Sequence, residues 1–149
     1  ADSLDMLADS FVYGLSLFAI GGTVALKKRI ATAAGYFQIA LAIIGFVEVF
    51  RRFIDTSELP DFKTMIIVSV LALIANGICL VLLQRSKSEE AHMKASMIFT
   101  SNDVMINLGV IAAAVLVNWT ESNKPDLVIG IIVFGLVIQG AVRILKLGK

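Results

Sequence analysis

Residues 64–83 read TMIIVSVLALIANGICLVLL, which is a run of 20 consecutive positions without a charged side chain. An α-helix needs about 20 apolar residues to cross the roughly 30 Å hydrocarbon layer of a membrane. The rest of the chain is also apolar, with 58% hydrophobic residues, whereas soluble domains average roughly 45–50%. We therefore expect an integral membrane protein in contact with lipid.

Four further apolar stretches flank this one, so the sequence predicts an all-α, polytopic membrane bundle that forms a single transmembrane domain over residues 1–149. The five predicted transmembrane helices span about residues 5–26, 31–53, 63–84, 93–117 and 127–146. Both prolines, Pro60 and Pro125, lie in the polar connections, where helices are expected to stop. Glycines within the helices, among them Gly35, Gly45 and Gly109, are expected to let neighbouring helices approach closely.

The basic residues predict an orientation, because they alternate between the connections as five spans require. Nine of the 13 fall on one side: Lys27, Lys28, Arg29, Arg85, Lys87, Lys94, Arg143, Lys146 and Lys149. The positive-inside rule predicts that this side and the C-terminus are cytoplasmic, and the inner membrane of the cell is the expected location. The chain has no catalytic motif, phosphate loop or basic stripe, so we expect neither an enzyme, a bound cofactor nor a nucleic-acid partner.

The first ten residues, ADSLDMLADS, contain two aspartates four positions apart, Asp5 and Asp9, which share one face of a helix. Helix capping by acids is the alternative interpretation. It suits Asp2, and it suits Asp5 only if the helix begins near residue 2. It does not account for Asp9, which is followed by 17 uncharged residues, 10–26. A charge inside a membrane helix costs about 2.5–3.5 kcal/mol, so Asp9 favours a functional role.

A second polar group lies in ASMIFTSNDVMINLGVIAAAVLV, residues 95–117. Asp103 is about 13 Å along the helix from Lys94, and no Lys or Arg lies within a turn or two. Thr100 and Asn107 share its face, whereas Asn102 points about 100° away. Hydrogen bonding between helices is the alternative role. Carboxylates on two membrane helices, unbalanced by nearby cations, are expected either to be partly protonated or to hold a cation.

Other polar residues predict simpler roles. Gln38, Asn76 and Gln139 are single amides in apolar helices, where interhelical hydrogen bonds are expected. His92 follows Glu89 and Glu90 in the charged connection 84–94 and is expected to be a solvated loop residue, with a peripheral metal ligand as the alternative role.

The segments ADSLDMLAD and SMIFTSNDVMINLGVIAAAVLV resemble the second and fifth transmembrane helices of cation diffusion facilitators, which are divalent-metal/proton antiporters with six transmembrane helices. GYFQIALAIIGFVEVFRRF and LALIANGICLVLLQR resemble the third and fourth helices, so the resemblance covers essentially the whole chain as helices two to six. It implies that the first family helix and the cytoplasmic C-terminal domain are absent from these residues. It also implies cytoplasmic termini and a homodimer.

The resemblance implies a metal site made by two pairs of residues, each pair four positions apart on its helix. The first pair is Asp5 and Asp9, and Asp103 ends the second pair. The remaining position holds Phe99, which has no metal-binding atom. The candidates for the fourth ligand are water, Thr100, Asn102 and Asn107. Without an imidazole the site is all-oxygen, and we expect it to select Zn²⁺ less strongly.

The sequence thus predicts a divalent-cation efflux transporter that exchanges metal for protons by alternating access. Zn²⁺ is the expected cargo, with Cd²⁺, Co²⁺, Mn²⁺ and Fe²⁺ as alternatives. A non-transporting membrane protein, whose buried aspartates serve helix packing or partner assembly, is the main alternative function, and a passive channel is a third. Asp9 lies about 27 Å before Lys27 along a continuous helix. We therefore expect the first helix to extend beyond the bilayer into the cytoplasm, so that Asp9 can meet Asp103.

Overall fold

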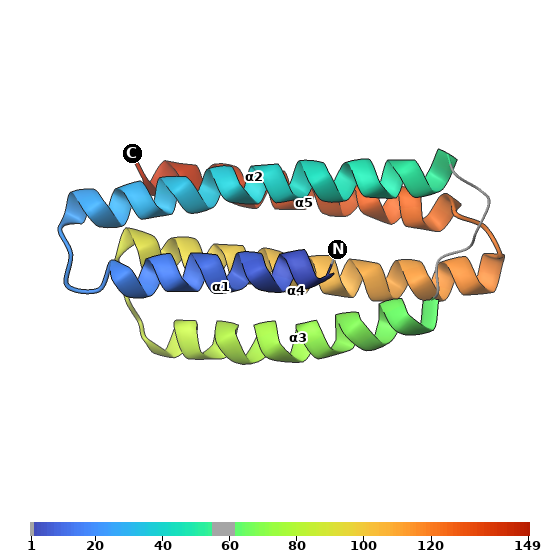
Figure 1. Ribbon diagram of the computed structural model, residues 1–149, viewed down its shortest axis with the longest axis horizontal. Helices are drawn as coiled ribbons and strands as arrows, with labels where there is room; N and C mark the ends of the chain where they lie inside the picture. Colours follow the sequence, from blue (N-terminus) through green and yellow to red (C-terminus); the bar gives the residue numbers. More distant parts are fainter. Residues whose placement is uncertain (1, 55–61) are drawn as a thin grey trace.

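The chain forms five α-helices and, within the described ranges, no strand, which confirms the all-α prediction. The structure is a computed structural model that describes the backbone of residues 2–54 and 62–149 and the side chains of residues 8–54 and 63–149. The helices are α1 (Asp2–Phe18), α2 (Val24–Ile54), α3 (Phe62–Arg85), α4 (Ala91–Thr120) and α5 (Lys124–Leu147). They run side by side along one elongated bundle (Figure 1).

Four of the described helices, α2 to α5, are long and apolar enough to cross a membrane, while α1 has 17 residues. The most apolar 18-residue windows of these four have mean hydropathies from 1.6 to 2.8. In α3 only 11% of the window is buried inside the protein. A helix that is apolar all round and mostly uncovered is suited to lipid contact. These features support the predicted integral membrane protein.

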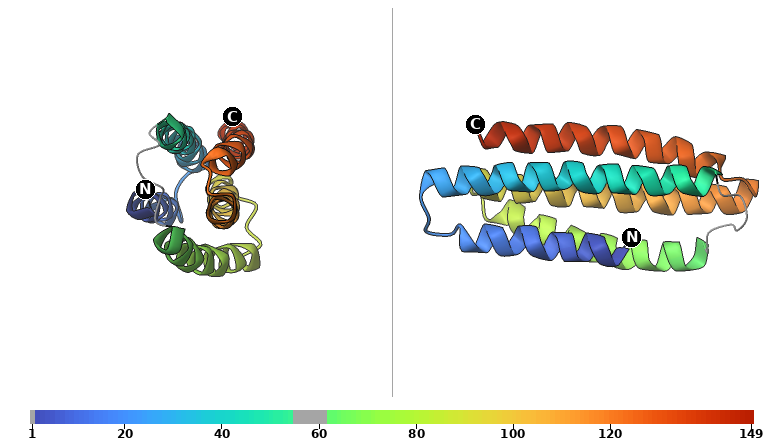
Figure 2. Two further views of the ribbon diagram at one scale, coloured as in Figure 1. Left: turned by 90° about the vertical axis from the view of Figure 1, so that its right-hand side faces the viewer. Right: turned by 45° about the horizontal axis from the view of Figure 1, so that its top comes forward.

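Helix α4 occupies the centre of the bundle. It packs extensively against α3 and α5, and α2 packs along α5 and also contacts α4. Helix α1 lies against α4, α2 and α3 (Figures 1 and 2). The α1–α2 turn, the α3–α4 connection and the C-terminus lie at the same end of the bundle. The three basic clusters therefore gather at that end, where the Lys28 ammonium donates to the Lys149 carbonyl at 3.0 Å; we call it the basic end.

The junction between α1 and α2 differs from the prediction, because α1 ends at Phe18 and α2 already begins at Val24. The turn uses Gly21 at φ +78°, a backbone conformation that glycine adopts without strain. Thr23 then caps α2, since its Oγ1 accepts a hydrogen bond from the Leu26 amide at 3.2 Å. The predicted boundaries 5–26 and 31–53 were therefore wrong at this junction.

This turn changes the depth of the first-helix aspartates. Asp9 lies nine residues before the end of α1, about 14 Å, and Asp103 lies 12 residues after the start of α4, about 18 Å. The two positions therefore lie at similar depths. The expected extension of the first helix beyond the bilayer was wrong, and it is α2 that carries the additional residues, including Lys27.

Glycines set the closeness of the helix pair α2–α5. A Cβ on Gly35 would lie 2.7 Å from Leu145 Cδ2, and a Cβ on Gly109 of α4 would lie 2.6 Å from Val133 Cγ2 of α5. The predicted close approach is confirmed at these two positions. At Gly45 no atom lies within 4 Å of such a Cβ, so close approach is not the role of that glycine.

Candidate metal centre

Helices α1 and α4 meet through a line of polar side chains, which we call the polar seam. The Ser16 and Ser96 hydroxyls form a hydrogen bond, and the Tyr13 hydroxyl lies 2.6 Å from Thr100 Oγ1. Ser96 and Thr100 are fully buried. Since Ser16 pairs with Ser96 and Tyr13 with Thr100, the two helices run antiparallel, and the next turn of the seam brings together residues 9 and 103.

Asp9 and Asp103 do lie together in the structure, as the sequence predicted. The Asp9 carboxyl faces the Asp103 carboxyl and the Asn76 amide, close enough for both to act on it as hydrogen-bonding partners. Asp103 is 8% exposed and Asn76 is 7% exposed. Asp9 Oδ1 is buried and has no hydrogen-bond partner among the described residues. Three helices, α1, α3 and α4, thus bring two carboxyls and one amide to a single buried point.

Asn76 is a member of this group for which the sequence predicted only a hydrogen bond between helices. The sequence feature that could have indicated Asn76 is its place as the single amide within the 20 uncharged residues of 64–83. The spacing of residues along α3 cannot indicate which neighbour the amide faces. That information comes from the packing of α3 against α4 and α1.

The backbone of Asp5 lies in α1, one turn before Asp9, but its side chain lies outside the described part of the chain. Within that part, no three His, Cys, Asp or Glu side chains converge as metal ligands would. The described portion of the centre therefore consists of two carboxylates and the Asn76 amide. Whether Asp5 completes the site stays a prediction.

The other candidate ligands are distributed around α4. Thr100 faces the polar seam and donates to the Ser96 carbonyl at 2.9 Å. The Asn107 amide donates to the Asp103 carbonyl oxygen at 2.9 Å. Asn102 lies on another face, against Gly140 of α5, where a Cβ would collide with its amide. The structure therefore brings Thr100 and Asn107 near Asp103 and directs Asn102 away from Asp9.

Phe99 occupies the core beside the centre. It is 1% exposed and belongs to an apolar cluster with Val12 of α1, Ala95 of α4 and Ile144 of α5. A ring of this size fills the position where the family resemblance placed a ligand. Phe99 therefore packs in the apolar core and offers no atom that could complete a coordination shell.

Asp103 also borders a cavity of about 190 Å³ between α2, α4 and α5. Gln38 of α2 and Asn107 line it near Asp103, and Glu48, Arg52 and Asp126 line it toward the end of the bundle opposite the basic end. Gln38 is 1% exposed, and its Oε1 has no hydrogen-bond partner among the described residues. Asp103 thus lies where the polar seam meets this cavity, whose lining is mainly apolar apart from these few polar groups.

Comparisons with known proteins identify related sequences. Residues 1–148 match the family profile of the cation efflux transmembrane domain. The zinc transporter ZitB of Escherichia coli (strain K12) is 29% identical over an alignment that covers 79% of this chain and 39% of that protein. The ZitB proteins of Pectobacterium atrosepticum, at 27% identity over 79% of this chain and 38% of that protein, and of Yersinia pseudotuberculosis, at 23% over 98% and 51%, are further relatives.

The chain spans about two fifths to one half of the length of these curated relatives. The family profile, in contrast, extends over nearly all of the chain. Together with the five-helix bundle, this match establishes that the chain belongs to the cation efflux family, the cation diffusion facilitators.

Proposed function

We propose that this chain is the membrane-embedded part of a divalent-cation exporter, with Asp5, Asp9 and Asp103 as the metal-binding carboxylates. The observation that carries the proposal is the meeting of Asp9, Asp103 and the Asn76 amide at one buried point contributed by three helices. Asn76 then supplies an oxygen ligand in place of the residue absent at Phe99, and water, Thr100 or Asn107 completes the shell.

The cargo we propose is Zn²⁺, because the relatives are zinc transporters. Carboxylate and amide oxygens also accept Mn²⁺ and other divalent ions, so Cd²⁺, Co²⁺, Mn²⁺ and Fe²⁺ are alternative cargoes. An all-oxygen site is expected to discriminate among them less than a site with an imidazole.

Proton exchange follows from the charge of the same group. Two or three carboxylates in a low-dielectric interior require a counter-charge. A bound divalent cation supplies it in one state, and protons on the carboxylates supply it in the other. The release of metal is therefore coupled to the uptake of protons, which is the basis of antiport.

Two features on opposite sides of Asp103, the polar seam and the cavity, support alternating access. The polar seam leads from Asp9 and Asp103 toward the basic end through hydroxyl pairs. The cavity between α2, α4 and α5 leads toward the opposite end. With the basic end in the cytoplasm of a cell with an inner membrane, metal enters along the seam and leaves through the cavity. By family resemblance we also propose that two copies form a homodimer.

The direct test is metal-driven proton flux in proteoliposomes with a pH-sensitive dye in the lumen. We expect saturable flux with Zn²⁺ and a loss of at least about tenfold for Asp103→Asn, since even outer partners of a metal site contribute about 10–100-fold. Glu121→Gln, which removes an exposed carboxylate from the α4–α5 turn, is the matched control and retains flux. Wild-type flux in Asp103→Asn contradicts the assigned site. Metal flux without proton movement indicates the passive channel, and a stable protein with no saturable metal binding indicates the packing role.

A further inference from the structure

His92 is buried in an unusual way. Its side chain is fully inaccessible, and neither ring nitrogen, Nδ1 or Nε2, has a hydrogen-bond partner among the described residues. The expectation of a solvated loop histidine was wrong, because residue 92 lies in the first turn of α4, against α1. Buried polar atoms are almost always hydrogen-bonded, so a ring with two unused nitrogens requires an explanation.

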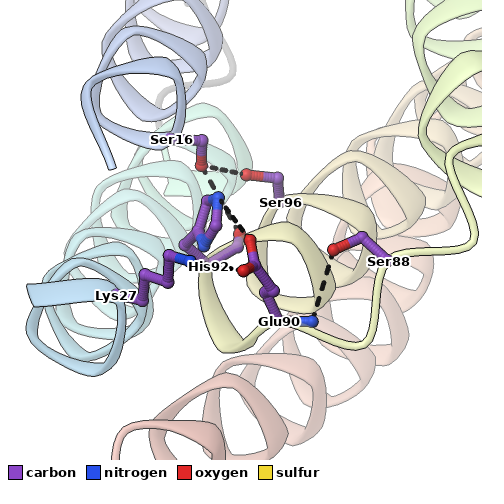
Figure 3. A network of polar contacts seen from close by, with 6 residues as sticks. All are labelled: Ser16, Lys27, Ser88, Glu90, His92 and Ser96. Carbon is purple, nitrogen blue, oxygen red and sulfur yellow. Dashed lines mark hydrogen bonds and ion pairs between the residues drawn. The ribbon is translucent and has the colours of Figure 1, made fainter. Parts of the chain in front are cut away.

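A carboxylate faces this ring from the α3–α4 connection. Glu90 Oε2 lies 3.7 Å from His92 Nε2, while Glu90 Oε1 forms an ion pair with Lys27 of α2 (Figure 3). The Glu90 side chain is 46% exposed, whereas that of Lys27 is only 14% exposed. A cation arriving from solution at the basic end therefore meets the Glu90 carboxylate first, with the imidazole directly behind it.

The two side chains offer the donors that transition metals prefer. A neutral imidazole nitrogen and a carboxylate oxygen both bind Zn²⁺ at about 2.0–2.2 Å, and imidazole also suits the other late first-row metals. The Lys27 ammonium already neutralises this carboxylate in the present structure. An incoming metal cation would take the place of this ammonium beside the Glu90 carboxylate.

The pair also lies at the outer end of the polar seam. Ser16 Oγ donates to the His92 carbonyl oxygen at 3.4 Å and bonds to the Ser96 hydroxyl (Figure 3). The following turn of the seam is Tyr13 with Thr100, and the turn after that is Asp9 with Asp103. Residue 92 therefore lies at the outer end of the row of polar pairs that leads to the carboxylate centre, and it joins that row through its backbone carbonyl.

We propose that Glu90 and His92 form a second divalent-cation station at the basic end of the bundle, which Lys27 closes by occupying Glu90. Two protein ligands and water hold the ion there weakly enough to pass it onward. The position of the station on a transport route rests on the proposed function, whereas metal binding by this pair does not.

The single histidine of the chain makes this station directly observable. Labelling with ¹⁵N-histidine reports one ring, and coordination moves the signal of the ligating nitrogen. We would titrate Zn²⁺ in a background carrying Asp5→Asn, Asp9→Asn and Asp103→Asn, so that the three central carboxylates contribute no site. We expect a saturable shift of one ring nitrogen, weakened at least about tenfold by Glu90→Gln.

Lys27→Met is the sharpest variant, because the proposal predicts a gain. Removing the competing ammonium should tighten Zn²⁺ binding at the ring by about two- to fivefold, the range that loss of one exposed ion pair permits. Lys94→Met, which removes the ammonium paired with Glu89 at the same end, is the matched control and leaves the affinity unchanged. Ring signals that Zn²⁺ does not move, or an affinity that Lys27→Met does not raise, overturn the station. A failure of proton flux in the wild-type protein leaves this titration intact, so the two proposals fail separately.

Discussion

The two sides of α4 are built on different principles. Toward α1 it presents hydroxyls and a carboxylate, and the contact is a line of hydrogen bonds such as that between Tyr13 and Thr100. Toward α5 it presents mostly small and apolar residues together with the Asn102 amide, and a Cβ on Gly109 would already press on Val133. The second kind of contact continues between α2 and α5, where Gly35 lies under Leu145.

This difference indicates which contact moves. Close packing at glycines gains dispersion from many atoms and loses it as soon as the helices part. Hydroxyl and carboxylate pairs can exchange partners with water or a cation at little net cost. We infer that α2, α5 and the side of α4 that faces α5 move together as a rigid unit. The polar seam between α1 and α4 is then the contact that opens.

The largest expected effect is on metal affinity. Asp9→Asn should weaken Zn²⁺ binding by about 100-fold, the upper end of what partners of a metal site contribute, while the free energy of unfolding without metal changes by less than about 1 kcal/mol. Calorimetric titration in detergent and unfolding curves measure the two quantities. The opposite pattern, with affinity retained and stability lost, would support a packing role for Asp9.

The next effect is on stability and concerns the α2–α5 contact. Gly35→Ala places a methyl group 2.7 Å from Leu145 Cδ2, and such overpacking costs typically about 1–3 kcal/mol. Gly45→Ala is the matched control, because no atom lies within 4 Å of the added Cβ. We expect only Gly35→Ala to lower the unfolding midpoint. Equal midpoints for both variants contradict the rigid role of the α2–α5 contact.

A smaller effect is expected in the polar seam. Tyr13→Phe removes the hydrogen bond to Thr100, worth about 0.5–1.5 kcal/mol, and leaves Thr100 bonded to the Ser96 carbonyl. Tyr36→Phe removes the hydroxyl from an exposed tyrosine of α2 and serves as control. Unfolding curves compare them, and a stability loss in Tyr13→Phe no larger than in the control is the contrary result.

The smallest effect concerns the ion pair at the basic end. The Lys27 ammonium beside Glu90 holds the pKa of that carboxyl below its ordinary value of 4.5. Because the pKa is lowered on folding, the pair stabilises the folded state above the ordinary value and stops doing so as the pH falls through the lowered pKa. Lys27→Met should return the Glu90 pKa toward 4.5, as read from a ¹³C titration of its carboxyl. If the Glu90 pKa is the same in Lys27→Met and in the wild type, the Lys27–Glu90 ion pair does not form in solution.

Much of the fold could be predicted from composition, because charge-free stretches near 20 residues have few alternatives to membrane helices. The α1–α2 boundary was missed because the charge pattern extended to Lys27, while the stop signal was the short Gly-Gly-Thr at 21–23. A glycine with positive φ followed by a capping threonine ends one helix and begins another even inside apolar sequence.

The sequence predicted those site residues that the pattern along a single helix can indicate. It did not predict those that depend on how the helices pack together. Asp9 and Asp103 were identified because uncompensated charge in an apolar helix is costly. The burial of His92 and the place of Asn76 in the centre were not predicted, because both depend on the neighbour that each side chain faces. The rotation of α3 and α4 about their axes decides that, and it comes from packing across the whole bundle.

The most direct measurement of the central claim compares a cross-link in each contact. Ser16→Cys with Ser96→Cys locks the polar seam, where the native hydroxyls are bonded. Val49→Cys with Gly130→Cys locks α2 to α5, where a Cβ on residue 130 lies 3.4 Å from the Val49 Cβ, close to disulfide geometry. Both pairs are made in a Cys79→Ser background, which removes the one native thiol.

Zinc-driven proton flux in proteoliposomes is then recorded before and after reduction. The account predicts that the oxidised seam pair is inactive and recovers on reduction, while the oxidised α2–α5 pair transports like its reduced form. A protein that transports at full rate with the seam cross-linked contradicts the account.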